Sequence, residues 1–304
     1  MRKLSVRRRW SARLSSILVL VISTHASVAQ TTDPVAPFLA EFQSADLISR
    51  ENAFYALLNL GATTGVGTGS MLESEVSGLL SSYPSDRSKI VSALTTLLTI
   101  ENTDASLGAS TADPQNEDDS DFYLDLLEAV ADLNDPSTIN SLVGGIGSGA
   151  VVTSRLASFG PIALDAVVAQ TYSPYIHDRN GAAFTLTTML SKPYVGLVSD
   201  ETSQSKIRAG LTRAVASFAP PSPYSYVQTT YQSVLNRMGA AVRGDVNGDG
   251  VVNCADLIVI KSSFGKSYMQ PGFDIRADVN GDGVVNIVDL SIESRLMPAG
   301  TVCQ

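Results

Sequence analysis

Apolar residues recur at spacings of three and four along most of the chain, from Pro37 to about Met238. This period places apolar side chains on one face of an α-helix, and no convincing alternation of apolar and polar residues predicts a strand there. The predicted helices are short, with start and stop signals such as Gly61 and the pair Asp135-Pro136. The pattern therefore predicts an all-α region in which short helices pack in pairs.

The pattern changes at Gly244, where the acidic, glycine-rich stretch GDVNGDGVVNCADL begins, and a near copy, ADVNGDGVVNIVDL, follows from Ala277. In each copy, side-chain oxygens occupy positions 1, 3, 5, 9 and 12 of a twelve-residue loop, glycine occupies position 6, and the carbonyl of position 7 adds another oxygen. These are the ligand positions of an EF-hand calcium loop. The predicted donors are Asp245, Asn247, Asp249, Val251, Asn253 and Asp256 in the first copy and Asp278, Asn280, Asp282, Val284, Asn286 and Asp289 in the second.

Two such matches in register make an ordinary Asx-rich turn a poor explanation of these loops. Each loop gathers three carboxylates, which would repel one another without a compensating cation. Magnesium fits less well than calcium because it demands tighter octahedral geometry and keeps its waters. We therefore expect two calcium ions to be part of the fold of the C-terminal region.

The first 29 residues read as an export signal. They combine a basic start, a short apolar run from Ile17 to Ile22 and the small-residue ending Ser27-Val28-Ala29. The apolar run is too short to cross a bilayer of ~30 Å, which needs about 20 residues. We expect cleavage after Ala29, a secreted protein that is extracellular or periplasmic, and no membrane anchor.

Removal of the signal makes the chain strongly acidic. The signal carries six basic and no acidic side chains, which leaves 15 basic against 30 acidic residues and a net charge near −15. This excess repels phosphate backbones and anionic lipid surfaces, so nucleic acid and membrane surfaces are poor candidate partners, whereas cations are good ones.

Part of the helical region resembles HEAT-type repeats, in which antiparallel helix pairs stack into an α-solenoid. The resemblance covers roughly Phe122 to Phe218 and includes DLNDPSTINSLV, LASFGPIALDAVVAQ and DRNGAAFTLTTMLSKP. The alternative, an irregular helical domain without repeats, stays open. The polar, acidic stretch from Asn102 to Ser120 predicts a solvated loop between two helical lobes.

The C-terminal region resembles the type I dockerin module over Gly244 to Cys303. Each loop ends in aspartate, lacks a full helix before it, and is followed by one amphipathic segment that stops near Gly265 or Pro298. The resemblance implies two bound calcium ions and docking to a cohesin domain of another protein. It divides the chain into a signal peptide at 1–29, a helical HEAT-like domain at 30–238, a linker at 239–243 and a dockerin at 244–304.

In the dockerin family, the two residues after the ninth loop position and basic residues about one turn beyond the loop contact the partner. The matching candidates here are Cys254, Ala255 and Lys261 in the first copy and Ile287, Val288 and Arg295 in the second. The usual hydroxyl pair is absent, each helix has one basic residue where two are common, and Glu293 replaces the apolar residue that matches Ile260. These departures distinguish the chain from the cellulosomal pattern.

The chain has two cysteines, Cys254 and Cys303. An even pair in an exported chain favours one disulfide over two free thiols. The dockerin resemblance implies the same pairing, because that family brings its two ends together. Since the disulfide would involve Cys254, docking through the second copy is favoured over docking through the first.

The sequence offers no catalytic constellation. After export, no tryptophan and a single histidine, His177, remain, so a multi-histidine zinc site is excluded. No GxSxG or HExxH motif occurs, and nothing singles out a pair among the acids Glu41, Glu51, Asp125, Glu128, Asp165 and Glu201. Tyrosines are the aromatic residues left for binding sugar, and Tyr172, Tyr175, Tyr224 and Tyr226 fit packing or turn positions better.

Two functions therefore remain. We favour a non-catalytic exported protein in which the helical domain is a scaffold or binding surface and the dockerin mediates docking. The alternative is an extracellular hydrolase of O-glycosyl bonds in polysaccharide, because dockerins often accompany such enzymes. A deep cleft with paired, desolvated carboxylates would favour the hydrolase.

Overall fold

Helices are the regular elements of this protein, as the apolar spacing predicts. The computed structural model describes residues 33–61, 71–103, 117–222, 225–239, 242–268 and 270–303. Within these ranges there is no β-strand, and the single isolated bridge pairs Ser267 with Val284. The predicted signal peptide, its cleavage site and Tyr224 lie outside them.

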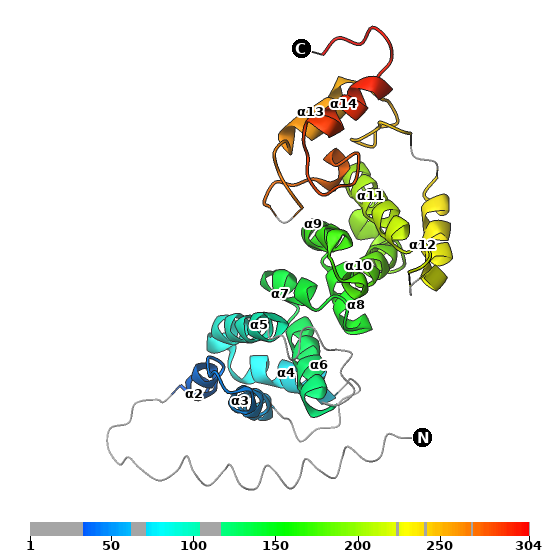
Figure 1. Cartoon of the computed structure of the whole chain (residues 1–304). Coiled ribbons are helices and arrows are strands. Elements are labelled where there is room, and N and C mark those ends of the chain that lie inside the picture. The colour runs from blue at the N-terminus through cyan, green and yellow to red at the C-terminus, as the bar shows by residue number, and fades with distance from the viewer. Residues whose placement is uncertain are drawn as a thin grey trace, which may run out of the picture. The chain divides into compact units, whose positions relative to one another are not determined.

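The α-helices run in the order shown in Figure 1. They are α2 (Ala36–Glu41), α3 (Leu47–Asn59), α4 (Met71–Ser82), α5 (Arg87–Thr103), α6 (Glu117–Asp132), α7 (Ile139–Gly144), α8 (Ala150–Ser158), α9 (Pro161–Ala169), α10 (Ile176–Met189), α11 (Glu201–Ser217), α12 (Ser225–Arg237), α13 (Cys254–Ser262) and α14 (Ile287–Leu296). Short 3-10 turns join them at η2 (Pro84–Asp86), η3 (Pro136–Thr138), η4 (Gln170–Tyr172), η5 (Tyr194–Val198) and η6 (Ile275–Ala277).

Aspartate caps explain several helix starts. The carboxylate of Asp46 accepts a hydrogen bond from the Ser49 amide at 2.9 Å, and the carboxylate of Asp200 accepts one from the Ser203 amide at 2.8 Å. Asp135 caps η3 with Pro136 in its first turn, which confirms the predicted start at this pair.

The predicted loop from Asn102 to Ser120 is wrong at both ends. Helix α5 continues to Thr103, and α6 already begins at Glu117. Asn102 is not solvated as a loop residue would be, because its amide donates to the Ser141 carbonyl at 2.8 Å and accepts from the Tyr123 hydroxyl at 2.6 Å. These tertiary contacts continue the helix into a stretch whose composition predicts a loop. Residues 104–116 lie outside the described ranges.

A buried ion pair joins the first helices. Arg50 of α3 donates to the carboxylate of Glu101 of α5 at 2.5 and 3.2 Å, and both side chains are at most 5% exposed. A two-point contact of this kind fixes the relative position of two helices more narrowly than apolar packing does. Removing either partner would leave a buried charge uncompensated.

The helices from α3 to α12 pack mainly against neighbours one to three elements away. Helix α10 contacts α8, α9, α11 and α12, and α11 also contacts α9 (Figure 1). Such local packing gives an all-α region of stacked short helices. A regular HEAT-like solenoid stays a prediction.

The C-terminal loops form a small core of their own. Val246, Ile260, Ala277 and Val285 are buried together, and helices α13 and α14 pack against each other. Residues 38–304 form one compact unit. Within that unit α11 contacts η6, so the helical region and the C-terminal region share an interface.

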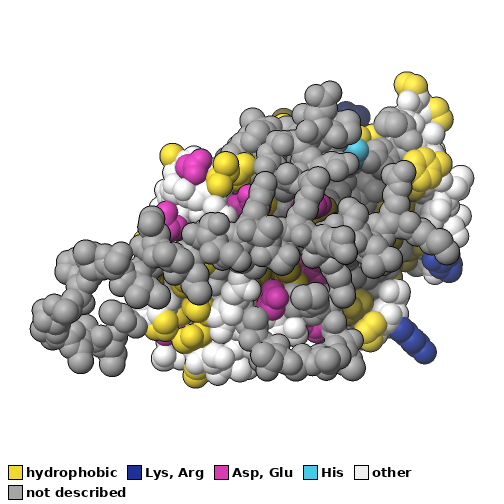
Figure 2. Space-filling model, turned by 90° about the horizontal axis from the view of Figure 1, so that it is seen from below, with side chains coloured by type: hydrophobic (Ala, Val, Ile, Leu, Met, Phe, Trp, Pro, Cys, Tyr) yellow, Lys and Arg dark blue, Asp and Glu magenta, His cyan; other side chains and the backbone are white. Residues whose placement is uncertain are grey.

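On the face seen in Figure 2, acidic side chains of the described residues lie at separate places among hydrophobic ones. Among those residues, no helix has the length and apolar character needed to span a bilayer.

Candidate metal-binding loops and exposed helix face

The two C-terminal loops wrap around their first aspartate in the same way. Asp245 accepts hydrogen bonds from the amides of Gly248 at 2.8 Å and Gly250 at 2.9 Å. Asp278 accepts the equivalent pair, from Gly281 and Gly283, at 2.8 Å each. The backbone therefore follows the same path in both loops, as the repeated sequence predicts.

The ninth and twelfth positions tie each loop to the helix that follows. Asn253 caps α13 by accepting from the Ala255 amide at 2.7 Å, while the Asp256 carboxylate accepts from the Asn253 amide at 2.8 Å. Asn286 and Asp289 form the same capping box at α14. Asp256 and Asp289 are fully buried, so each loop and its helix form one rigid motif.

The fifth position forms the exposed tip of each loop, while the sixth is exposed at Gly250 and buried at Gly283. The Asn247 amide donates to Asp249 at 2.8 Å, and the Asn280 amide donates to Asp282 at 2.9 Å. At the sixth position, Gly250 and Gly283 have φ values of +86° and +88°, which a residue with a Cβ adopts only under strain. The glycine predicted for the sharp bend therefore occupies the position that needs it.

Electrostatic repulsion is clearest in the second loop. Burial raises the pKa of Asp278, and the carboxylates of Asp289 and Asp282 raise it further. Hydrogen bonds from the Tyr172 hydroxyl and the Gly283 amide act in the opposite direction on this pKa. A divalent cation would offset the repulsion among these carboxylates.

An additional carboxylate, Glu293 of α14, points to a cation at the first loop. Glu293 is fully buried, and among the described residues neither of its oxygens has a hydrogen-bond partner. Burial raises its pKa to about 7, helped by the charges of Asp256 and Asp245 in the first loop. A buried, unpaired carboxylate is costly unless a cation compensates it, so these residues fit a bound metal ion.

The donor chemistry suits calcium. Each predicted set contains oxygen atoms alone, which hard cations prefer over soft transition metals. Half of each set consists of asparagine side chains and one carbonyl, so carboxylates alone do not define either site. The described part of the chain contains no cluster of three or more histidine, cysteine, aspartate or glutamate side chains arranged to hold a metal ion, so the three aspartates of each loop are not gathered as a metal site in this structure.

Comparison with known families agrees with this geometry. Residues 243–295 match the family model of the dockerin type I domain. Domains of this family bind calcium and dock to cohesin domains. Proteins that carry dockerin domains are typically extracellular or associated with the cell surface. No curated protein and no solved structure is significantly similar to the chain.

A disulfide closes the dockerin domain. Cys254, the first residue of α13, is joined to Cys303, with 5.5 Å between their Cα atoms and 49 residues of sequence separation. The bridge ties the start of the first helix to the end of the domain, as the resemblance implies. It also engages one of the residues that would otherwise be a candidate partner contact.

The predicted partner contacts are unequally exposed. Ile287 and Val288 of α14 are 65% and 46% exposed, and Arg295 is exposed on the same helix. In the first copy Lys261 is exposed, whereas Ala255 is only partly so. The second copy therefore presents more apolar surface at the matching positions.

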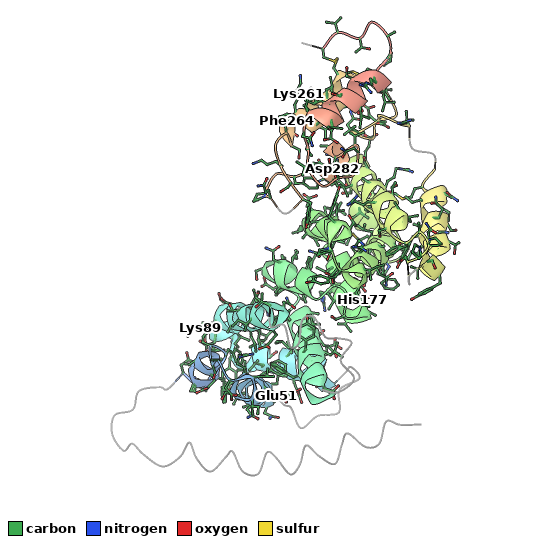
Figure 3. All side chains as sticks on the ribbon, in the orientation of Figure 1. Glu51, Lys89, His177, Lys261, Phe264 and Asp282 are labelled. Carbon is green, nitrogen blue, oxygen red and sulfur yellow. A yellow bond between two sulfur atoms is a disulfide. The ribbon has the colours of Figure 1, made fainter. Side chains whose placement is uncertain are left out.

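Two exposed apolar residues were missed by motif matching. Ile258 of α13 is 64% exposed, and Phe264, just after that helix, is 48% exposed. Figure 3 labels Phe264 and Lys261 near the end of α13. Ile258 lies four residues after Cys254 and three before Lys261, a spacing that places all three on one helix face. This spacing could have identified Ile258 from the sequence.

Two of the acids considered for catalysis, Asp125 and Asp165, have structural contacts, as does Asp178, the residue after His177. The Asp178 carboxylate accepts from the Ser173 hydroxyl at 2.7 Å, and Figure 3 shows His177 well away from the dockerin loop that carries Asp282. Asp125 accepts from the Tyr55 hydroxyl at 2.9 Å, and Asp165 pairs with Lys206 at 2.5 Å. These contacts join α3 to α6 and α9 to α11.

One open hollow of about 370 Å³ lies beside α8. Its lining residues are Ala150, Val151, Ser154, Arg155, Ser158 and Tyr194. None of them is a carboxylate, so this hollow does not supply the acid pair that glycoside hydrolysis requires.

Proposed function

We propose that this protein is exported and that its dockerin domain binds two calcium ions and docks to a cohesin-type domain of another extracellular protein. The helical region then serves as a non-catalytic scaffold or binding surface. The observation that carries this proposal is the matched hydrogen-bond network of two complete twelve-residue loops inside a segment that matches the dockerin family.

The calcium ligands we propose are the same positions in both loops. They are Asp245, Asn247, Asp249, the Val251 carbonyl, Asn253 and Asp256 in the first loop, and Asp278, Asn280, Asp282, the Val284 carbonyl, Asn286 and Asp289 in the second. Calcium supplies the positive charge that lets three carboxylates share one loop. The protein contributes the backbone amides that hold the first and twelfth carboxylates in place.

A calcium titration tests the ligand assignment. Calorimetry on residues 30–304 should give two ions per chain, and Asp249→Ala or Asp282→Ala should each reduce this to one. The expected affinity is modest, with a Kd on the order of 10⁻⁴ to 10⁻³ M, as in other extracellular modules. A stoichiometry that stays at two in either variant would show that the assignment is wrong.

The docking face we propose lies mainly on α14. It comprises Ile287, Val288 and Arg295, with Ala255 and Lys261 contributing from α13. Apolar residues exposed on a rigid helix face are the kind of anchor that protein interfaces use.

Binding to a panel of immobilised cohesin domains, measured by surface plasmon resonance in calcium, tests this face. Ile287→Asp should abolish binding that the unaltered chain shows. Ile48→Asp is a matched control, because Ile48 is exposed to the same degree, 64% against 65%, on α3 of the helical region. Equal binding by both variants would contradict the proposed face.

The proposal for the N-terminus is cleavage after Ala29. Sequencing the secreted protein should give Gln30 as the first residue. Assays of the same material on common polysaccharides test the non-catalytic role, and release of sugar by the purified chain would favour the hydrolase instead.

A further inference from the structure

Tyr172, at the end of η4, connects the helical region to the second dockerin loop. Its hydroxyl donates to the Asp278 carboxylate at 2.6 Å. Its ring stacks on Tyr268 with 5.3 Å between ring centroids and meets the edge of Phe273 at 5.6 Å. The side chain is buried at this contact, 106 residues away in sequence from the carboxylate it binds.

Arg213 of α11 strengthens the same contact from the other side. Its guanidinium lies 3.9 Å from the centre of the Tyr172 ring, a cation–π contact, and also donates to the Gly281 carbonyl. Gly281 occupies the fourth position of the second loop. The helical region therefore holds this loop at its first carboxylate and at one backbone carbonyl.

The first loop also lies against α11, but in a different way. A Cβ on Gly248, its fourth residue, would lie 3.0 Å from the Cβ of Ser205. Ser205 and Arg213 are eight residues apart, about 12 Å along a helix, so α11 runs past both loops. Among the described residues, no side chain of the helical region donates a hydrogen bond to Asp245, so the contact with a loop aspartate is specific to the second loop.

The bonds at Asp278 divide between its two oxygens. Oδ2 accepts from the Tyr172 hydroxyl and the Gly283 amide, while Oδ1 accepts from the amides of Gly281 and Asp282. Groups that hydrogen-bond a metal ligand from outside the site orient it, and their removal typically weakens metal binding by about 10- to 100-fold. Tyr172 has this relation to Asp278.

We propose that the helical region forms the outer shell of the second calcium site, in which Tyr172 and Arg213 position Asp278 and the Gly281 carbonyl. Calcium binding at the second loop and docking of the helical region onto the dockerin then strengthen each other, because coupling between two binding events is reciprocal. This inference rests on the proposed calcium sites. It assigns different roles to the two loops, whose local sequences are nearly the same.

The contact is compatible with partner docking. It covers the fourth and sixth positions of the second loop, where Gly281 and Gly283 approach Arg213 and Tyr172. Ile287 and Val288, on the following helix, stay exposed. The dockerin can therefore contact the helical region through its loops and a partner through α14.

Calcium titrations in single-site backgrounds test the proposal. In a chain carrying Asp249→Ala, which retains the second site, Tyr172→Phe should raise the calcium Kd about tenfold because it removes one hydroxyl and keeps the ring. In a chain carrying Asp282→Ala, which retains the first site, Tyr172→Phe should leave the Kd unchanged. Tyr175→Phe, at a tyrosine 64% exposed on the same region, is the matched control and should have no effect in either background.

Amide hydrogen exchange gives a second readout with an unaltered helical region. Calcium should slow exchange in α11 around Arg213 in the full chain and in the Asp249→Ala variant, but not in Asp282→Ala. A chain that binds two calcium ions, with the Kd insensitive to Tyr172→Phe and no slowing in α11, would overturn this inference and leave the proposed function intact. A chain that binds no calcium would overturn both.

Discussion

Glu293 shows how one residue can distinguish two otherwise equivalent halves. The repeat places it at the position of Ile260, which lies in the small dockerin core. Glu293 is equally buried, but it brings a carboxylate close to the first loop. Among the described residues, this carboxylate has no hydrogen-bond partner. The sequence indicated only a departure from the family pattern, because no local signal shows which loop a buried glutamate faces.

Glu293→Gln should change stability and calcium affinity in opposite directions. The folded pKa is raised from 4.5 to about 7, so the folded state retains a proton that the unfolded state releases, and stability is lost as pH rises through this range. In EGTA at pH 8 the variant dockerin should therefore be more stable than the unaltered one by up to about 3 kcal/mol, and at pH 4 the two should be equal. With calcium, the first site should bind more weakly. Urea unfolding at both pH values and calorimetry measure the two effects, and a variant less stable in EGTA at pH 8 would contradict the account.

The two loop glycines should tolerate alanine unequally. Both have positive φ, so alanine costs about 1 to 2 kcal/mol at either position. A Cβ at Gly250 meets no atom within 4 Å, whereas one at Gly283 lies 3.2 Å from the Tyr268 ring and 3.4 Å from the Tyr172 ring. Gly283→Ala should therefore lower the free energy of unfolding more than Gly250→Ala does, measured in saturating calcium. Equal losses would show that the Tyr172 contact is not tightly packed.

At the scale of elements, local signals predicted much of the fold. The Asp135-Pro136 start and the backbone path of both C-terminal loops follow from a few adjacent residues whose chemistry fixes the backbone. The end of α5 could not be predicted in this way. It depends on Asn102, whose hydrogen bonds reach Ser141 and Tyr123 in other helices.

Asp132, the last residue of α6, should make the helical region sensitive to pH. Burial and the neighbouring charge of Glu128 raise its pKa to about 6, although Arg155 lies 3.7 Å from one carboxylate oxygen. Because the folded pKa exceeds the ordinary value of 3.8, this group lowers stability as pH rises from about 4 to 6.

Asp132→Asn should therefore raise the free energy of unfolding of the helical region by up to about 3 kcal/mol at pH 8 and have little effect at pH 4. Circular dichroism during urea unfolding at the two pH values measures the difference. Asp165→Asn is the control, because Asp165 is 65% exposed and its pair with Lys206 should contribute little at either pH. A gain of the same size at both pH values would show that burial of the charge is not the cause.

At the scale of the whole molecule, the dockerin depends on more than its own apolar core. Four buried residues form that core, which is small for an independent domain, and the disulfide, the proposed ions and the contact with α11 add to it. The sequence predicts the disulfide and the ions, since a residue count stands behind the first and a local motif behind the second. It could not predict the contact of Tyr172 with Asp278, because no pattern links residues 106 positions apart.

Chelation should therefore affect the two regions to different extents. Calcium at about 100 times its Kd stabilises a folded site by about 2.7 kcal/mol, so EGTA should strongly lower the temperature at which the dockerin unfolds. Most far-ultraviolet helical signal should persist, because α3 to α12 lie outside the dockerin. The temperature at which the helical region unfolds should fall by a smaller amount, since this region loses only the support of the second loop at Tyr172 and Arg213.

Scanning calorimetry of residues 30–304 in calcium, in EGTA and in magnesium measures these shifts in unfolding temperature. Magnesium should restore less of the unfolding temperature than calcium does. Identical scans in calcium and EGTA would show that the ions are not part of the fold, and a helical transition that does not move at all would show that the two regions unfold independently.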